Sequence, residues 1–181
     1  MTVLLFLAEG FEEIEAVAPI DIFRRADVKV TTVSVASDKI VTGAHGIAIV
    51  ADKLFEEIDL SGENLLFLPG GMPGTTNLDK HEGLRNLILS HAENGKSIAA
   101  ICAAPSILGK LDLLKGKEAI CYPGFEGQLS GAEISESVVV KSGSIYTAKA
   151  AGVAIDFALR IVEDIKGVEV AQKIAKAISL S

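Results

Sequence analysis

The sequence predicts an α/β sandwich with a mostly parallel central sheet. Three continuous apolar runs, typical of strands covered on both faces, support this fold: Thr2–Ala8, Asn64–Leu68 and Ser97–Ile101. Segments with helical spacing of apolar residues alternate with these runs along the chain, the pattern that βαβ units produce. Right-handed crossovers then bring the carboxyl ends of the strands to one edge of the sheet, where sites form in open α/β sheets.

The first part of the chain alternates as this fold requires. After Thr2–Ala8, apolar residues at helical spacing predict a helix over Phe11–Ala26, which we expect Pro19 to bend or interrupt. The β-branched, alternating segment Val28–Ala36 predicts a second strand. A turn over 42–46 precedes a short strand at Ile47–Val50.

The rest of the chain repeats the alternation. The strand Asn64–Leu68 ends at Pro69-Gly70-Gly71, an amphipathic helix follows at Asp79–Glu93, and Ser97–Ile101 forms the central strand. A helix then begins near Pro105, because proline is well placed in a first helical turn. Further strands are expected at Lys117–Cys121, Ser137–Val140 and Ile145–Ala148, and further helices at Ala151–Ile165 and Val168–Ile178.

Bulk properties indicate one domain over residues 1–181, with a core built from aliphatic side chains since tryptophan is absent. The net charge of −7 argues against nucleic acid or an anionic membrane as partner. Two cysteines do not make a disulfide framework, and no apolar run reaches the length of about 20 residues that spans a bilayer. We therefore expect a cytoplasmic protein that neither crosses nor binds a membrane.

Cys102 lies where the central strand turns directly into a helix, which is the geometry of a nucleophile elbow. The free N–H groups of the helix N-terminus create positive potential there, which favours the reactive thiolate. The alternative is a buried structural cysteine, since free cysteine is among the most buried residue types. The segment alone leaves both interpretations open.

The topology favours the reactive cysteine, because the loops 9–15, 69–74 and 102–105 follow strands expected to be neighbours. Gly70 and Gly71 permit close backbone approach, and their N–H groups, with that of Ala103, would form an oxyanion hole. A protonated carboxyl group near the sulfur would donate a hydrogen bond to a thiolate. The alternative for the acidic residues of the first loop (Glu12, Glu13 and Glu15) is a favourable interaction with the helix dipole.

Other chemistry-bearing residues have simpler interpretations. Cys121 falls in an expected strand and is assigned to the core, and the three histidines (His45, His81 and His91) are scattered. The sequence has neither the Cys–x–x–Cys nor the His–x–x–x–His spacing of a metal site, so no metal is predicted. It also lacks the phosphate-binding G-x-x-x-x-G-K-[ST] motif, so nucleotide hydrolysis has no support.

Four motifs in order carry a resemblance over nearly the whole chain: AEGFEEIEAVAPIDIFRRADVKV, LPGG, AAICAAPSILG and AGVAIDFALRIVEDIKG. Through them the sequence resembles the DJ-1/ThiJ/PfpI superfamily, and most closely its DJ-1-like branch. The resemblance implies a flavodoxin-like three-layer fold of the class I glutamine amidotransferase type. It also implies a homodimer with a reactive cysteine on the elbow and no cofactor.

Position by position, the resemblance makes Cys102 the nucleophilic and oxidisable cysteine and Glu15 the acid that hydrogen-bonds its sulfur. Gly71 and Ala103 match positions whose amides point into the pocket, and Arg25 matches an arginine near the subunit contact.

The sequence departs from the family at the residue after Lys117–Cys121, where many relatives have histidine and this chain has Tyr122, followed by Pro123. Tyrosine, with an ordinary pKa of about 10, is a poor base, which weakens a cysteine peptidase interpretation. His45 stands where some relatives have a basic residue near the pocket. We treat Tyr122, Pro123 and His45 as candidate pocket residues.

The resemblance implies a cysteine-dependent enzyme that converts 2-oxoaldehydes to hydroxy acids or removes their early adducts, of the glyoxalase III or deglycase type. A small carbonyl compound is then the substrate, Cys102 the nucleophile and Glu15 the proton shuttle. The alternative is an oxidative-stress sensor or redox-regulated chaperone that uses oxidation of Cys102. A peptidase or a thiamine-related role has less support.

Overall fold

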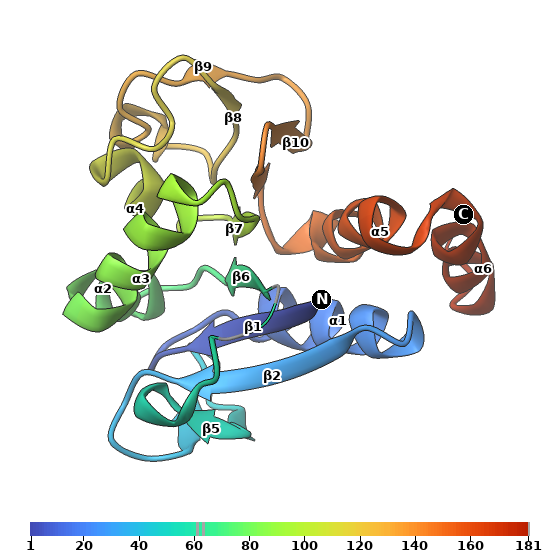
Figure 1. Cartoon of the computed structure of the whole chain (residues 1–181), viewed down its shortest axis with the longest axis horizontal. Helices are drawn as coiled ribbons and strands as arrows, with labels where there is room; N and C mark the ends of the chain where they lie inside the picture. Colours follow the sequence, from blue (N-terminus) through green and yellow to red (C-terminus); the bar gives the residue numbers. More distant parts are fainter. Residues whose placement is uncertain (61, 63, 181) are drawn as a thin grey trace.

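The computed structural model describes residues 1–60, 62 and 64–180, and one seven-stranded sheet runs through its centre (Figure 1). Every neighbouring pair in that sheet is parallel except the pair at one edge, β10 and β11. The order across the sheet is β10 (Val139–Ser142), β11 (Ile145–Ala148), β7 (Ile98–Ile101), β6 (Asn64–Leu68), β1 (Thr2–Leu7), β2 (Lys29–Ser34) and β5 (Lys53–Leu54).

Helices cover both faces of the sheet, which confirms the predicted sandwich (Figure 1). One core cluster joins the sheet to α1, α5 and α6, and contains the contacting rings of Phe23, Phe67 and Phe157, which meet edge to face or tilted. A second cluster joins the other face to α2, α3 and α4. The bounds are α1 (Glu13–Arg25), α2 (Gly74–Lys80), α3 (Glu82–Glu93), α4 (Pro105–Lys110), α5 (Ala154–Lys166) and α6 (Val168–Ala177).

Short elements complete the fold. The strands β3 (Ile40–Thr42) and β4 (Ala48–Val50) form an antiparallel hairpin, and β8 (Glu118–Ala119) pairs in parallel with β9 (Glu133–Ile134). Three 3₁₀ segments are η1 (Phe55–Glu57), η2 (Glu126–Gln128) and η3 (Ala151–Val153). None of the helices within the described residues is long and apolar enough to cross a membrane.

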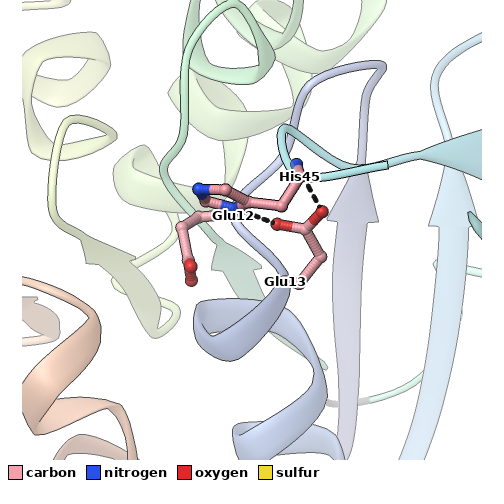
Figure 2. A group of neighbouring side chains, drawn as sticks. All are labelled: Glu12, Glu13 and His45. Carbon is pink, nitrogen blue, oxygen red and sulfur yellow. Dashed lines mark hydrogen bonds and ion pairs between the residues drawn. The ribbon is translucent and has the colours of Figure 1, made fainter. Parts of the chain in front are cut away.

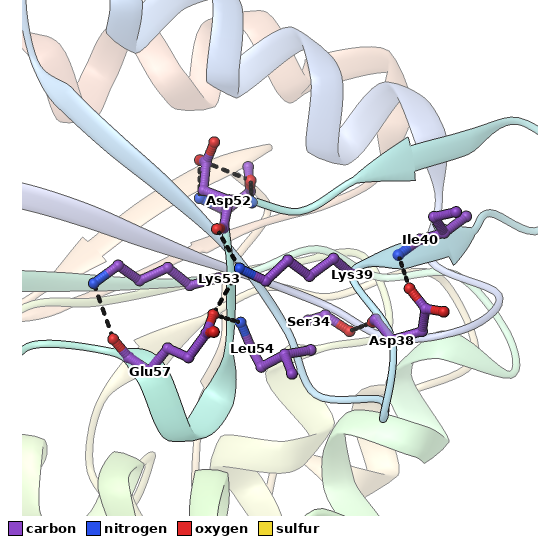
Figure 3. A network of polar contacts seen from close by, with 9 residues as sticks. Ser34, Asp38, Lys39, Ile40, Asp52, Lys53, Leu54 and Glu57 are labelled. Carbon is purple, nitrogen blue, oxygen red and sulfur yellow. Dashed lines mark hydrogen bonds and ion pairs between the residues drawn. The ribbon is translucent and has the colours of Figure 1, made fainter.

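A polar network fixes the hairpin and β5 to the edge of the sheet (Figure 3). The Asp52 carboxylate accepts hydrogen bonds from the Thr32 N–H and hydroxyl groups, at 2.8 and 2.9 Å. Lys39 forms an ion pair with Glu57 at 2.8 Å and donates to the Asp52 carbonyl oxygen. These contacts compensate for the small number of ladder bonds that such short strands make.

The sequence predicted that Pro19 would bend or interrupt helix α1, and the interruption does not occur. The helix is continuous through Pro19, which lies buried on the same side as Ala16, Ile22 and Phe23. Packing of this apolar stripe against the sheet and α5 keeps the helix intact although proline removes one backbone hydrogen bond.

The predicted helix Asp79–Glu93 is two helices, because the chain turns at His81. The His81 backbone is extended, and its Nδ1 accepts a hydrogen bond from the Leu84 N–H at 3.0 Å, so it caps α3. Its ring also contacts Phe55, with 4.5 Å between centroids. Histidine is not among the preferred capping residues, so the pattern gave no signal for this break.

The short strands are where the other boundaries differ. The expected strand Ser137–Val140 is β10, displaced by two residues to Val139–Ser142, and Lys117–Cys121 shortens to β8. The strands β3, β5 and β9 were not expected, because segments of two or three residues have no measurable periodicity.

The order of the strands determines where a site can form. The strands β1 and β6 are neighbours in the sheet. The chain leaves β1 toward β2 on one side and leaves β6 toward β7 on the other, so the two connections diverge between β1 and β6. Such a switch point leaves a crevice at the carboxyl ends of the strands. The loop after β7, which holds Cys102, lies next to the loop after β6.

Candidate active site at the elbow cysteine

Cys102 occupies the sharp corner between β7 and α4 and has a positive φ of 65°. A left-handed backbone is costly for a residue other than glycine, and such strain is typical of functional positions. The corner is fixed on both sides: the Cys102 N–H donates to the Ala148 carbonyl at 2.9 Å, and its own carbonyl accepts from the Tyr122 N–H at 2.7 Å. The side chain is partly exposed, as a nucleophile elbow requires.

Glu15 reaches this corner from the first turn of α1, and its side chain is fully buried. The Glu12 side chain caps the helix by accepting the Glu15 N–H at 2.7 Å, which fixes the turn. The Glu15 Oε2 atom accepts a hydrogen bond from the Gly70 N–H at 2.8 Å, so the loop after β6 holds the carboxyl group in place.

Only glycine fits at position 70. A Cβ atom there would lie 2.7 Å from Glu15 Oε2 and 2.8 Å from the Cys102 Cβ, closer than carbon atoms approach. The three loops expected to meet at the sheet edge therefore do meet, and Gly70 is their point of closest approach.

The second oxygen of Glu15, Oε1, is buried and has no hydrogen-bond partner of standard geometry among the described residues. The Cys102 thiol lies close enough to form a hydrogen bond with the same carboxyl group. A buried oxygen without a partner is costly, and protonation of the carboxyl group reduces that cost.

The pKa values of the pair follow from this burial. Burial raises the pKa of Glu15 to about 7, against the smaller lowering effects of the Cys102 thiol and the Gly70 N–H. Burial, followed by the charge of the Glu15 carboxylate, raises the pKa of Cys102 to about 12.

This direction is opposite to our expectation that the helix N-terminus would favour the thiolate. The Ala103 and Gly71 N–H groups do lower the pKa of Cys102, but burial and the neighbouring carboxylate outweigh them. Protonation of Glu15 removes its repulsion of the thiolate. The two groups are therefore coupled: Glu15 ionises first as pH rises, and its charge keeps the proton on the Cys102 thiol.

The backbone donors divide their roles differently from the sequence prediction. We expected Gly70 to offer its N–H to a substrate oxygen, but this N–H is engaged by Glu15. The Gly71 and Ala103 N–H groups act on the Cys102 sulfur and lower the pKa of its thiol. Gly71 has a φ of +89°, and a Cβ atom there would lie 2.4 Å from the Glu12 backbone nitrogen.

The remaining candidate residues lie around this centre or away from it. Tyr122 and Pro123 are exposed in the turn that is bonded to the Cys102 carbonyl. Arg25 is exposed at the far end of α1 and pairs with Asp21 at 2.6 Å. Cys121 is fully buried in the core, as expected.

His45 bonds to Glu13 (Figure 2), and none of its contacts within the described residues runs to Cys102. Its Nδ1 lies 2.8 Å from Glu13 Oε2, and its backbone N–H donates to Oε1 at 2.6 Å. Burial acts to raise the pKa of Glu13, but the hydrogen bonds from His45 outweigh it and the net pKa is lowered. The Glu13 hydrogen bond raises the pKa of His45.

Sequence reasoning missed this role of Glu13, which fastens the β3–β4 hairpin to the start of α1. The sequence feature that relates to this role is Gly43. A Cβ atom at position 43 would lie 2.4 Å from Glu13 Oε1, so glycine allows the hairpin to approach Glu13. Within the described part of the chain, the ligand atoms of Glu12, Glu13 and His45 lie within 4.8 Å of one another. Their hydrogen bonds to the helix cap and the hairpin already explain this grouping, so we assign no metal to it.

Comparison with known proteins shows the family and the fold. Residues 1–164 match the DJ-1/PfpI family. The chain belongs to this family. It is 33% identical to protein dj-1beta of Drosophila melanogaster over 177 residues, which are 97% of this chain and 95% of that protein. The structure of oxidised DJ-1 from Toxoplasma gondii superposes with a TM-score of 0.93 at 37% identity, and the alignment covers 98% and 97% of the two chains.

A relative in Arabidopsis thaliana, protein DJ-1 homolog A, is 38% identical over an alignment of 182 positions that covers 99% of this chain and 46% of that protein. The chain thus spans slightly less than half the length of that relative.

Proposed function

We propose that this DJ-1/PfpI protein is a cysteine-dependent enzyme that converts 2-oxoaldehydes to 2-hydroxy acids, or removes their early adducts, with no cofactor. The observation that carries the proposal is the pairing of Glu15 with Cys102: a fully buried carboxyl group, held by the Gly70 N–H at 2.8 Å, acts on a thiol at a strained elbow. A pKa of about 7 allows Glu15 both to give and to take a proton near neutral pH.

The proposed reaction has three steps: addition of the sulfur, proton transfer through Glu15 and hydrolysis. The Cys102 sulfur adds to the aldehyde carbon, and the new oxyanion takes a proton to give a hemithioacetal. Glu15 removes the hydrogen on that carbon as a proton and returns it to the adjacent keto carbon, while the hydroxyl proton moves to the former keto oxygen. The hemithioacetal thereby becomes the thioester of a 2-hydroxy acid. Water then hydrolyses the thioester to the hydroxy acid and restores the thiol. The aldehyde carbon is oxidised and the keto carbon reduced, so no external redox partner is needed.

The backbone donors support the charged intermediates. The Gly71 and Ala103 N–H groups act on the Cys102 sulfur. In the adduct, the carbon bonded to this sulfur carries the oxygen on which negative charge develops, so the same two donors are close to that charge. Loss of one such donor typically raises a barrier by roughly 3–4 kcal/mol.

Lactate release from methylglyoxal tests the proposal. We expect Cys102→Ser to abolish release and Glu15→Gln to lower kcat at least about 100-fold, the contribution typical of a general acid–base. Cys121→Ala is the matched control, because it removes the other thiol from the core and not from the elbow. Equal rates for the wild type and Cys102→Ser would end the proposal.

A second candidate function is redox sensing, which the different exposure of the two cysteines favours. Cys102 is partly exposed and Cys121 is fully buried, so peroxide reaches the elbow first. Mass spectrometry after mild peroxide treatment should find added oxygen on Cys102 before Cys121. Oxygen appearing first on Cys121 contradicts this role.

We also propose that the chain forms a homodimer. Four large apolar side chains are exposed on α1 and on the β3–β4 hairpin: Ile14, Val17, Ile47 and Val50, with exposed fractions of 55, 47, 58 and 70%. The Ile47 N–H donates to Glu13 Oε1 at 3.4 Å, which brings the hairpin beside the start of α1. Apolar side chains grouped in this way favour contact with another protein surface.

A further inference from the structure

Two aromatic side chains stand in the turn that follows β8, directly beside the elbow. The Tyr122 N–H bonds to the Cys102 carbonyl at 2.7 Å, so standard bond lengths place the Tyr122 Cα at most about 10 Å from the sulfur. The Tyr122 side chain is 47% exposed, whereas the preceding Cys121 is fully buried. Tyr122 is therefore exposed at the surface, and its backbone is bonded directly to the elbow that carries Cys102.

The turn is held rigidly. The Phe125 N–H donates to the Tyr122 carbonyl at 3.0 Å and closes it, and the Gly124 N–H donates to Glu126 Oε2 at 2.8 Å. Gly124 has a φ of +94°, which a side chain would strain.

The second ring anchors the first. Phe125 is half-buried against the core cluster that also contains Cys121. The Tyr122 ring meets it edge to face, with 6.4 Å between centroids and 80° between planes. An exposed ring supported in this way loses little conformational entropy when another ring packs on it.

We propose that Tyr122, supported by Phe125, forms an aromatic subsite of the Cys102 site and that it binds the aryl group of an arylglyoxal. This inference rests on the proposed function and adds a substrate class to it. The aldehyde carbon reaches the sulfur while the aryl group packs on Tyr122. A methyl substituent offers no comparable surface, so the subsite distinguishes phenylglyoxal from methylglyoxal.

The ratio of kcat/KM for phenylglyoxal to that for methylglyoxal tests the subsite. Both substrates take up one water, giving mandelate and lactate. An aromatic contact is worth about a 3- to 10-fold effect, so we expect Tyr122→Ala to lower the ratio by that factor and Tyr122→Phe to retain it. The control Ile134→Ala, an exposed apolar residue on β9, should leave the ratio unchanged. An unchanged ratio in Tyr122→Ala overturns the inference.

A second measurement does not depend on turnover. Cys102 is alkylated with iodoacetamide and with its N-phenyl analogue, each of which forms a thioether and releases iodide and a proton, and rates are followed by mass spectrometry. We expect Tyr122→Ala to lower the rate ratio of the phenyl to the parent reagent about 3- to 10-fold, and Tyr122→Phe to retain it. If neither aldehyde is turned over but this ratio depends on Tyr122, the proposed function fails and the subsite stands. A rate ratio independent of Tyr122 overturns the subsite.

Discussion

Cys102 and Glu15 lie close together, and burial disfavours the charged form of each side chain. Glu15 is fully buried, and among the residues that the structure describes only its Oε2 atom has a standard hydrogen-bond partner. Burial and the neighbouring Glu15 carboxylate raise the pKa of the Cys102 thiol. One negative charge is tolerated at this site, stabilised by the Gly71 and Ala103 N–H groups, but two are not.

The first prediction follows from this repulsion. Glu15→Gln removes the carboxylate charge but keeps an oxygen for the Gly70 N–H, so the pKa of Cys102 should fall below its wild-type value. Thiolate absorbance measured against pH gives the value, with Cys102→Ser as the blank that isolates the signal of Cys121. A Cys102 pKa that rises in Glu15→Gln contradicts the paired titration.

The second prediction concerns stability. The pKa of Glu15 is raised from 4.5 to about 7 in the folded state, so the unfolded chain ionises first as pH rises. Below pH 4.5 both states are protonated and folding is unaffected. The free energy of unfolding then falls as pH rises through 7, by about 2–3 kcal/mol between pH 5 and pH 8.

Urea unfolding at pH 5 and pH 8 measures this change. Glu15→Gln cannot ionise at position 15, so its loss of stability over the same interval should be smaller by about 2–3 kcal/mol. Equal losses in the two proteins would show that Glu15 is solvated and does not bear the cost of burial.

The residue scale shows what sequence reasoning achieves and where it stops. The motif around Cys102 and the acidic run that contains Glu15 are visible in the sequence, and the fold does bring the two together. The direction of the Cys102 pKa was not predictable, because it depends on how much water the folded loops exclude. The role of Gly70 was also missed, since its N–H serves Glu15 and not a substrate.

At the scale of elements, the site depends on three strand ends meeting at one point. The strand β1 leads to the loop before Glu15, β6 leads to Gly70 and β7 leads to Cys102. Long buried strands such as these were predictable because their apolar runs are continuous. The break at His81 and the strands β3, β5 and β9 were not, because each depends on tertiary contacts such as the ring of Phe55 on His81.

The third prediction tests that meeting point. A methyl group at position 70 would lie 2.7 Å from Glu15 Oε2 and 2.8 Å from the Cys102 Cβ, so Gly70→Ala must separate the loops. We expect it to cost about 1–3 kcal/mol of stability and most of the 2-oxoaldehyde activity. Gly127→Ala is the matched control, since a Cβ there meets nothing within 4 Å. Similar activity in the two variants means that the loops tolerate more separation than the geometry indicates.

At the scale of the whole molecule, the sheet separates two cores. Helix α1 on one face and the β3–β4 hairpin together carry the exposed apolar group of Ile14, Val17, Ile47 and Val50. Helix α1 packs its buried stripe on the sheet while Ile14 and Val17 remain exposed on it. The Glu13–His45 pair fastens the β3–β4 hairpin to the same end of α1. Glu12, Glu13 and Glu15 are adjacent in sequence, so the first turn of α1 connects this surface with the Cys102 site.

The fourth prediction follows from that connection. If the exposed apolar group is covered by a second copy, the wild type should sediment as a dimer at micromolar concentration, and the double variant Val17→Glu, Ile47→Glu should sediment as a monomer, because four carboxylates would be buried in each interface. The control Ile134→Glu places the same charge on an apolar side chain that is 46% exposed on β9, and it should remain a dimer. A double variant that stays dimeric places the interface elsewhere, and a monomeric wild type removes it. Because α1 also presents Glu15 to Cys102, the monomeric variant should show a changed Cys102 pKa, whereas the control should keep the wild-type value.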